Sequence, residues 1–465
     1  MKKFLVLAAL VLTFVLVLGA CGNGNGGDGE VAIPADGEAW TGTLNIWSFT
    51  DEAERQAIIF QGMHPEVNVE FQMVGMDGGA YEEWVLTALA AGGANVPDVI
   101  YLEAGFVRAF VMGHFLDNLN DLLPLAREIE MYQFVIDIGS YEGEVRAFSW
   151  QATPGVMYYR RSIAEEVFGT SDPAAIQNYF RDLDTTIESA RRIRDVTNGS
   201  AFFVGHPGEM NAMFVANRED PWIVNNRLVI DPMMIEQWNF GRILFDEGLQ
   251  TDVTTWSENW FASMRDEFFD AEGNQRRIFA HFLPTWGLTH VIQSNAPDSS
   301  GDWAIIPGPL GYSQGGTWMG IPQASNNPQL AREFIRSTVL NPEFLSNWAL
   351  GVYDNAYLRA IDPTIPEGVT QGGGDFVSSA VVAGQIADQF YGTPVYHFVG
   401  GQNPYTVFAQ AAPYIDLRNL QGTDAAIGGP WADARTMYLE GLGTMEESLQ
   451  FFRDNVQMVV PGLDW

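Results

Sequence analysis

The chain has 465 residues, and its 58 Asp and Glu residues against 24 Lys and Arg give a formal net charge of −34. Such an acidic surface repels nucleic acid and anionic lipid headgroups, so we expect no nucleic-acid partner. Lysine occurs at Lys2 and Lys3 alone, which excludes Lys-containing phosphate-binding loops, pyridoxal Schiff bases and Ser-x-x-Lys acyl enzymes from the rest of the chain.

The N-terminus has the pattern of an export signal. Lys2 and Lys3 precede an apolar run, Phe4–Leu18, that is too short to span a bilayer comfortably. Leu18-Gly19-Ala20-Cys21 then has the form of a bacterial lipobox, in which the Cys is diacylated and begins the mature chain. The alternative is an ordinary secretory signal that happens to contain a Cys. Since Cys21 is the chain's single cysteine, no disulfide forms within it. We predict a lipoprotein signal peptide over residues 1–20, lipidation at Cys21 and an extracytoplasmic protein anchored to the cell membrane.

Residues 21–39 are rich in Gly, Asn and acidic residues and contain little to bury, so we predict a flexible tether. The rest of the chain is too long for one ordinary core and fits two lobes. From Thr43 onward the pattern is α/β, with strands expected at Leu44–Phe49, Val67–Val74 and Pro97–Leu102 and helices expected from Thr50, over Ala80–Ala91 and around Phe106–Met112. Alternating strands and helices favour a mainly parallel sheet whose ligands gather beyond the strand C-termini.

A crossing between the two lobes is predicted near Trp150. Glu144–Trp150 is typical of a strand, Pro154-Gly155 breaks it, and Val156–Tyr159 is a second β-favouring run. Ser162-Ile-Ala-Glu165 then matches a capping box at a helix start. Trp150 and Gln151 therefore lie where two closing lobes would contact a ligand.

After the crossing, Asp or Asn followed by Pro indicates helix starts at Asp172, Asp231, Asn327 and Asn341. Thr251–Phe269 carries Trp256 and Trp260 at a helix-like spacing. Ile278–Pro284 is a predicted strand that leads to Trp286, and Asp302–Pro307 is a predicted strand at the return crossing. Gly315-Gly316-Thr317 indicates a tight turn that presents Trp318.

The sequence offers little catalytic chemistry. Its six histidines are scattered without a His-Glu-x-x-His motif, and it contains neither a Gly-x-Ser-x-Gly elbow nor a nucleophilic Cys in its folded part. We therefore expect no metal, no cofactor and no enzyme activity. Because 58 acids make some carboxylate pair nearly inevitable, a glycoside hydrolase stays open as an alternative.

The chain has fourteen tryptophans, many beside Gly, Pro or amide residues in turns. A sugar offers an apolar face that stacks on Trp, and its hydroxyls need polar partners, since an unpaired buried polar group costs about 1–3 kcal/mol. Each Trp taken alone could equally be core packing, and Asp51 and Glu103 could be helix N-terminal charges. As a set, the candidate ligand-binding residues are Trp47, Asp51, Glu103, Trp150, Gln151, Trp222, Trp286 and Trp318.

Several motifs resemble the substrate-binding lipoproteins of carbohydrate ABC transporters, the extracellular solute-binding family that includes the maltose-binding proteins. The most specific are Leu44-Asn-Ile-Trp-Ser-Phe-Thr-Asp-Glu52 and Ala90-Ala-Gly-Gly-Ala-Asn-Val-Pro-Asp98, followed by Gln151-Ala-Thr-Pro-Gly155, Pro284-Thr-Trp286 and Gly315-Gly-Thr-Trp318. The resemblance implies a two-lobed α/β fold of the type II periplasmic-binding-protein kind, with a hinge of crossing strands. It assigns residues 40–153 and 305–340 to lobe I and residues 154–304 and 341–465 to lobe II.

The resemblance also implies a function. The protein would capture a sugar or oligosaccharide between the lobes and deliver it to the permease subunits of an ABC transporter, acting as a monomer without breaking a bond. In that arrangement Trp286 and Trp318 line the cleft, and Trp47–Asp51, Glu103 and Trp150–Gln151 face them. The alternatives are a secreted carbohydrate-active enzyme and a binding protein of the same fold for peptide or metal.

Overall fold

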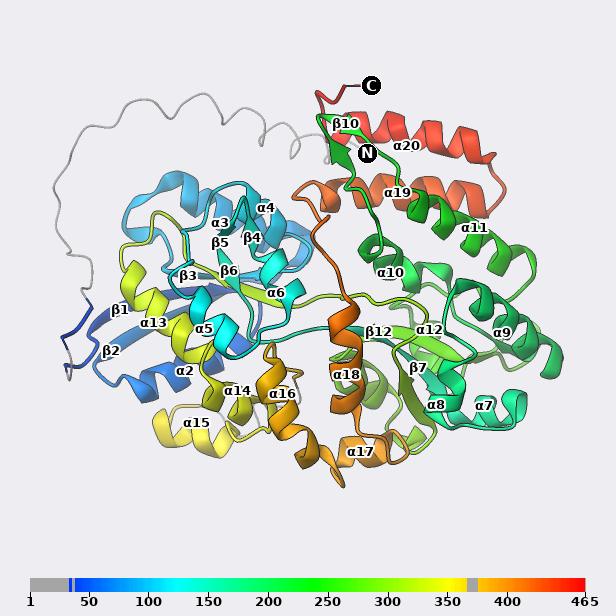
Figure 1. Ribbon diagram of the computed structural model, residues 1–465, viewed down its shortest axis with the longest axis horizontal. Coiled ribbons are helices and arrows are strands. Elements are labelled where there is room, and N and C mark those ends of the chain that lie inside the picture. The colour runs from blue at the N-terminus through cyan, green and yellow to red at the C-terminus, as the bar shows by residue number, and fades with distance from the viewer. Residues whose placement is uncertain (1–32, 36–37, 366–374, 465) are drawn as a thin grey trace.

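The computed structural model describes residues 33–35, 38–365 and 375–464. The predicted signal peptide, Cys21 and most of the predicted tether lie outside these residues. Two α/β lobes lie side by side, and short helices lie between them at one edge (Figure 1). The predicted two-lobed α/β fold is confirmed.

The first lobe is built on a five-stranded sheet of order β2-β1-β3-β14-β6. Its strands are β1 (Gly42–Ser48), β2 (Val67–Met73), β3 (Val99–Glu103), β6 (Ala147–Phe148) and β14 (Thr317–Gly320). The first three run parallel, and β14 runs antiparallel to β3 with Trp318 opposite Leu102. The sheet is therefore mixed, and Val99–Leu102 is buried on both faces, as expected for a central strand covered by helices.

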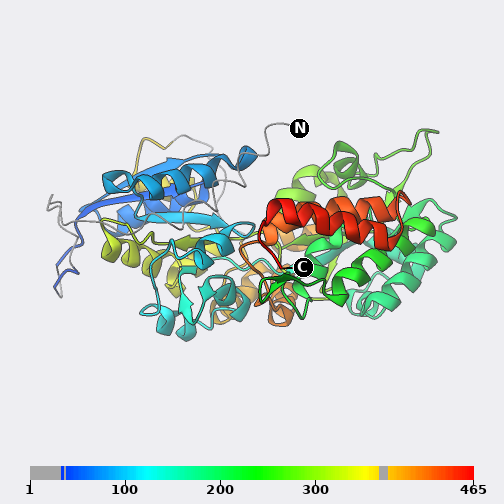
Figure 2. The same ribbon diagram turned by 90° about the horizontal axis from the view of Figure 1, so that it is seen from above.

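Helices cover both faces of this sheet (Figures 1 and 2). They are α2 (Glu52–Met63), α3 (Ala80–Ala91), α4 (Val107–Met112), α5 (Leu123–Glu128), α6 (Gln133–Ile138), α13 (Pro328–Thr338), α14 (Pro342–Ala349) and α15 (Asn355–Ile361). A small hairpin, β4 (Ser140–Tyr141) with β5 (Glu144–Val145), follows α6.

The second lobe contains a three-stranded antiparallel sheet of order β12-β7-β13. Its strands are β7 (Gly155–Arg160), β12 (Ala280–Pro284) and β13 (Trp303–Ile306), all buried. Shorter pairs are β8 (Ala201–Phe202) parallel to β11 (Arg277–Ile278), and β9 (Ile223–Val224) antiparallel to β10 (Arg227–Leu228).

The helices around the second sheet are α7 (Arg161–Phe168), α8 (Pro173–Gln177), α9 (Leu183–Val196), α10 (Asn211–Ala216), α11 (Pro232–Asp246), α12 (Glu258–Ser263), α19 (Asp424–Leu439) and α20 (Met445–Val459). Helices α16 (Ala380–Ile386), α17 (Pro394–Phe398) and α18 (Pro404–Ala411) connect the two lobes. Figure 2 shows α19 and α20 lying together along one side of the second lobe.

Single helical turns complete the described chain. They are η2 (Asp77–Gly79), η3 (Gly93–Asn95), η4 (Pro207–Met210), η6 (Pro297–Ser299), η7 (Ala387–Phe390) and η8 (Ala412–Tyr414), together with a π-helical segment, η5 (Gly287–Gln293).

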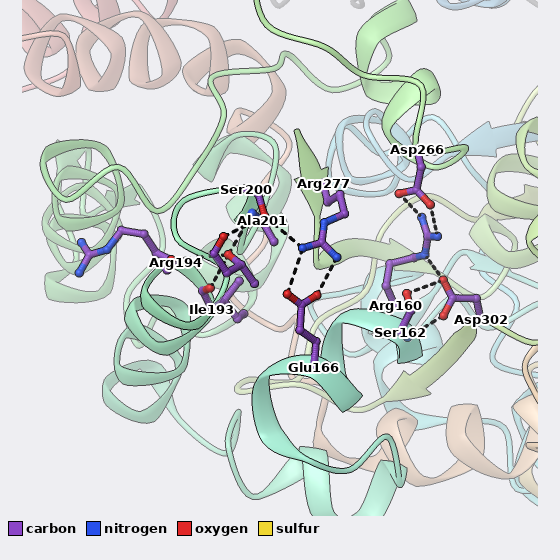
Figure 3. Close-up of polar contacts among 11 residues, drawn as sticks. Arg160, Ser162, Glu166, Ile193, Arg194, Ser200, Ala201, Asp266, Arg277 and Asp302 are labelled. Carbon is purple, nitrogen blue, oxygen red and sulfur yellow. Dashed lines mark hydrogen bonds and ion pairs between the residues drawn. The ribbon is translucent and has the colours of Figure 1, made fainter. Parts of the chain in front are cut away.

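A charged network fixes the end of β7 in the second lobe (Figure 3). The buried Arg160 guanidinium donates to Asp302 at 2.7 Å and to Asp266 at 2.6 Å. The backbone N–H and the hydroxyl of Ser162 both donate to the same Asp302 carboxylate. The cation therefore has two carboxylate partners, which a buried guanidinium requires if its desolvation is to be offset.

This network explains why the predicted capping box at Ser162–Glu165 is wrong. Helix α7 begins at Arg161, and Ser162 is already inside it with its hydroxyl bonded to Asp302. A partner 140 positions away in the chain thus replaces the local one. The helix expected over Thr251–Phe269 is likewise shorter, since only Glu258–Ser263 is helical.

Some of the other predicted elements fall where expected and some do not. Asp172, Asp231 and Asn341 cap their helices through side-chain hydrogen bonds, whereas Asn327 has no such cap bond. Strand β13 pairs with β7 over Trp303–Ile306, so strand pairing places the return crossing after Ile306 rather than at residue 305. Helix α15 packs on α2 of the first lobe, although the sequence assigned residues 341–465 to lobe II.

Candidate functional site

Three backbone segments pass side by side between the lobes. In the first and second, Gly155 N–H donates to Tyr312 O at 2.7 Å and Gln314 N–H donates to Thr153 O at 3.2 Å. The third segment joins the other side, where Ala152 N–H donates to Phe376 O at 2.8 Å. Together they form a short hydrogen-bonded hinge that holds the C-terminal ends of β1 and β3 near the second lobe.

Trp150 and Gln151 lie in this hinge, as predicted. The Trp150 side chain is fully buried, and its indole N–H donates to Asp375 Oδ2 at 3.3 Å, while the indole N–H of Trp348 donates to the same oxygen at 2.8 Å. The Gln151 backbone forms a bridge to Val377. Both residues are therefore bound into the crossing.

The Asp375 carboxylate also contacts the start of α2. A hydrogen bond joins it to the Glu52 carboxyl, and burial together with the charge of Asp375 raises the pKa of Glu52 well above its ordinary value. Protonated Glu52 can donate to Asp375, whose oxygens also accept the two indole N–H groups. Asp51, the predicted candidate one position earlier, is exposed at the N-cap of α2.

Glu103 and Trp286 are brought close to the same glycine turn. Ala104 N–H, next to Glu103, donates to Gly316 O at 3.0 Å. On the other side, a Cβ atom added at Gly315 would lie 3.1 Å from Trp286 Nε1. Gly315 and Gly316 both have positive φ, of 67° and 107°, which favours glycine. The turn thus joins the end of β3 to the tryptophan that follows β12.

Burial raises the pKa of Glu103, and its side chain accepts a hydrogen bond from Gly105 N–H. This carboxyl is only partly exposed and lies at the C-terminal end of a parallel strand, where ligands of such sheets bind.

Trp47 lies in an aromatic cluster at the adjacent strand end. Its ring stacks on Trp84 of α3 with centroids 3.6 Å apart and planes inclined by 9°. Phe49 contacts Tyr81 and Phe106 in edge geometry. Trp47 is 8% exposed and Trp84 is partly exposed, so the outer ring of this stack is Trp84, which the sequence analysis did not select.

Trp318 and Trp222 lie in lobe cores. Trp318 is 1% exposed on β14, and its indole donates to Val135 O at 3.0 Å. Trp222 is 3% exposed and packs against Trp431 and Phe452, with centroids 5.0 and 5.4 Å away. Both side chains are packed within the protein core. At Trp318 this is because Thr317, where a turn was expected, already belongs to strand β14, and at Trp222 because α19 and α20 cover the segment.

Trp256 is a candidate that the sequence analysis missed. Its side chain is 50% exposed and lies parallel to Trp286, with centroids 6.2 Å apart and an interplanar angle of 19°. Its backbone has a φ of 70°, which is uncommon for a bulky residue and clusters at functional sites. Trp260 supports it from behind at 5.2 Å. An exposed indole beside a partly exposed one is a platform suited to stacking a flat apolar face.

A cavity of about 310 Å³ lies elsewhere at the lobe junction, between α4, the β4–β5 hairpin and residues 418–421. The Arg108 guanidinium beside it donates to the carbonyl oxygens of Leu420, Ile138 and Ser140. Arg108 thus ties the first lobe to the segment that leads into α19.

Among the described residues, no group of three or more His, Cys, Asp or Glu side chains could hold a metal ion. No helix within the described ranges is both long enough and apolar enough to cross a membrane.

The fold is that of two-lobed solute-binding proteins. The chain is similar to an extracellular solute-binding protein family 1 structure (16% identity, TM-score 0.72, covering 90% of this chain and 99% of that one). It is also similar to the sugar-binding protein MalE from Xanthomonas citri (15% identity, TM-score 0.67, 90% and 97% covered). A third similar structure is the galacto-N-biose-/lacto-N-biose I-binding protein of the ABC transporter from Bifidobacterium longum (13% identity, TM-score 0.64, 91% and 98% covered).

No protein-family model matches the sequence, and neither does any curated protein. At these identities the structural similarity establishes the fold. The structural neighbours named here are binding proteins rather than enzymes.

Proposed function

We propose that the protein is the extracytoplasmic substrate-binding component of an ABC transporter and captures a sugar or oligosaccharide between its lobes. The observation that carries the proposal is the pair Trp256 and Trp286 on the second lobe, joined through Gly315-Gly316 to the Glu103 end of β3. Aromatic faces and a carboxyl at one junction match the apolar face and the hydroxyl edge of a saccharide. Two structural neighbours support this proposal, namely a sugar-binding protein of an ABC transporter and the sugar-binding protein MalE.

The mechanism follows from the hinge. A saccharide would bind one lobe first, and bending at the three hydrogen-bonded segments would bring the other lobe onto it. Closure is favoured only by the extra contacts that the ligand makes in the closed state. The closed form would be the one that a permease recognises. The motif at Cys21 supports a lipid anchor, which together with a flexible tether would raise the local concentration near the permease.

A glycoside hydrolase is less well supported. Hydrolases of this kind separate their two carboxyl groups by about 5–9.5 Å, whereas Glu52 and Asp375 are joined directly by a hydrogen bond. Their arrangement suits the holding of one proton between two carboxyl groups.

A thermal-shift screen of the mature chain against mono- and oligosaccharides, with peptides and divalent metals as controls, tests the proposal. A micromolar ligand at millimolar concentration stabilises the folded state by about 4 kcal/mol. We expect a clear rise in Tm with one class of saccharide and no product after incubation. A rise only with peptide or metal, or saccharide breakdown, would overturn the proposed function.

A further inference from the structure

Buried arginines in this chain generally have a partner with negative charge or several carbonyl groups. Arg160 has Asp266 and Asp302, Arg218 has Asp424 at 2.6 Å, and Arg108 has a set of backbone carbonyls. Such pairing is expected, because a buried guanidinium without compensation is costly.

Arg435 on α19 differs from these residues. It is 7% exposed, and within the described part of the chain its hydrogen-bond acceptor is the neutral amide oxygen of Asn211, 3.2 Å from Nη1. Its Nε is buried without a hydrogen-bond partner. Burial lowers the pKa of Arg435 to about 10, so the group is still cationic at neutral pH. The amide oxygen of Asn211 also accepts from Gln237 at 2.8 Å, which leaves it little capacity to compensate a full charge.

Arg435 is connected to the aromatic platform of the proposed sugar site through one short segment of the second lobe. This segment is His206 with the short helix η4, which follow β8, and a Cβ atom added at Gly208 would lie 3.5 Å from Arg435 Nη2. The same segment carries Glu209, which accepts the indole N–H of Trp260 at 3.0 Å. Trp260 in turn backs Trp256 at 5.2 Å. One short segment thus holds the unpaired cation on one side and the base of the aromatic platform on the other.

Among the described residues, the side chains that contact Arg435 do not supply an anion, although Asp252, Glu209 and Glu440 lie near enough that their charges act to raise the pKa of the adjacent His206. His206 accepts a hydrogen bond from Gly208 N–H through Nδ1, and burial and the charge of Arg435 lower the pKa of His206, so this imidazole is neutral at pH 7. Asn211 and Gln237 are amides. The chain has a net charge of −34 and therefore many carboxylates, yet none in the part that the structure describes forms an ion pair with this guanidinium.

We infer that Arg435 is the counter-charge for an oxyanion carried by the ligand, so that the captured saccharide is an acidic sugar. This inference rests on the proposed function. A guanidinium recognises carboxylate, sulfate and phosphate oxygens in the same forked geometry, so the anionic group is a uronate carboxylate or a sulfate or phosphate ester. Ligand binding supplies the missing partner and offsets the cost of the buried charge only in the liganded state.

The test is titration calorimetry of the full mature protein with matched probes. The acidic probes are galacturonate, digalacturonate, glucuronate, galactose 6-sulfate and glucose 6-phosphate. The neutral probes are galactose, galactobiose and glucose, and free sulfate and phosphate are added separately. We expect tighter binding of one acidic class than of its neutral counterpart. We expect Arg435→Met to weaken that binding by at least about 30-fold and to change binding of the neutral sugar by less than about 3-fold.

Arg218→Met is the matched control for stability. Removing Arg218 strands the Asp424 carboxylate, so its Tm without ligand falls, whereas Arg435→Met leaves no charge behind and its Tm is unchanged or raised. Preference for neutral sugars, or equal binding of the acidic probe by Arg435→Met, would overturn this inference and leave the proposed function standing. A fall in Tm of Arg435→Met equal to that of Arg218→Met would assign Arg435 to structure and overturn it as well. Binding of no saccharide, or of free anions alone, would overturn both proposals.

Discussion

Replacing Trp318 by Ala separates a core tryptophan from a ligand-binding one. The side chain is 1% exposed on β14 and its indole N–H donates to Val135 O. Truncating a fully buried Trp costs about 3–5 kcal/mol through lost burial and the cavity left behind. The Val135 carbonyl keeps a second donor, Gly139 N–H at 3.4 Å, so the added cost of an unpaired acceptor is small. We therefore expect Trp318→Ala to lose about 3–5 kcal/mol of unfolding free energy.

The matched variant is Trp256→Ala, because Trp256 is 50% exposed. A half-buried aromatic side chain contributes about 1 kcal/mol to the free energy of unfolding, so Trp256→Ala should lose about that much stability. Loss of its stacking surface should reduce the free energy of saccharide binding by about 1–3 kcal/mol. Urea unfolding followed by circular dichroism gives the first quantity, and calorimetry with the saccharide found in the screen gives the second. If Trp318→Ala keeps its urea midpoint and loses affinity, Trp318 contacts the ligand and the distinction drawn here is refuted.

Two carboxyl groups give opposite dependences of stability on pH. Burial acts to raise the pKa of Glu333, but hydrogen bonds from His64, Arg336 and Ser337 outweigh it and lower the pKa from 4.5 to about 2. Glu333→Gln should therefore lose up to about 2 kcal/mol at pH 7, after allowance for solvent screening, and the loss should vanish as pH falls from 4.5 toward 2. A deficit in urea unfolding that persists unchanged to the lowest pH would contradict this assignment. The raised pKa of Glu52 has the reverse effect, because the folded state holds its proton more tightly and stability falls as pH rises above 4.5. Glu52→Gln keeps a donor toward Asp375 without that proton, so its Tm should exceed that of the unaltered protein by a margin that grows with pH; a constant margin would show that the pair does not share a proton.

The sequence predicted the first lobe well, because its signals are local. The helix expected over Ala80–Ala91 has these bounds in the structure, and the strand expected from Val67 ends one residue earlier than predicted, at Met73. Repeated apolar residues with Gly or Asp at the ends specify such elements without help from distant segments.

The site was only partly predictable, because exposure is decided by distant contacts. Trp256 was expected within a helix and Trp318 after a glycine turn, yet Trp256 is half exposed and Trp318 is buried against Val135 of α6. Asp375 has no local signal at all, since its hydrogen-bond partner Trp150 lies 225 positions earlier in the chain. Arg435 likewise has no local signal, because it stands out only through the lack of a carboxylate partner among the described residues around it.

The hinge would allow the two lobes to move without losing their cores. Its first two segments approach so closely at Gly155 that a Cβ atom there would lie 2.0 Å from the Tyr312 ring. Tyr312 is itself held by its hydroxyl, which donates to Val156 O at 3.0 Å. This contact fixes one point of the crossing, while Gly315 and Gly316, with positive φ, allow the backbone beyond it to turn. Because the Glu103 and Trp286 contacts are made to that same glycine pair, bending at the hinge would change the spacing between the two halves of the proposed site. The proposed binding residues Glu103 and Trp286 are therefore linked directly to the glycine pair that would permit closure.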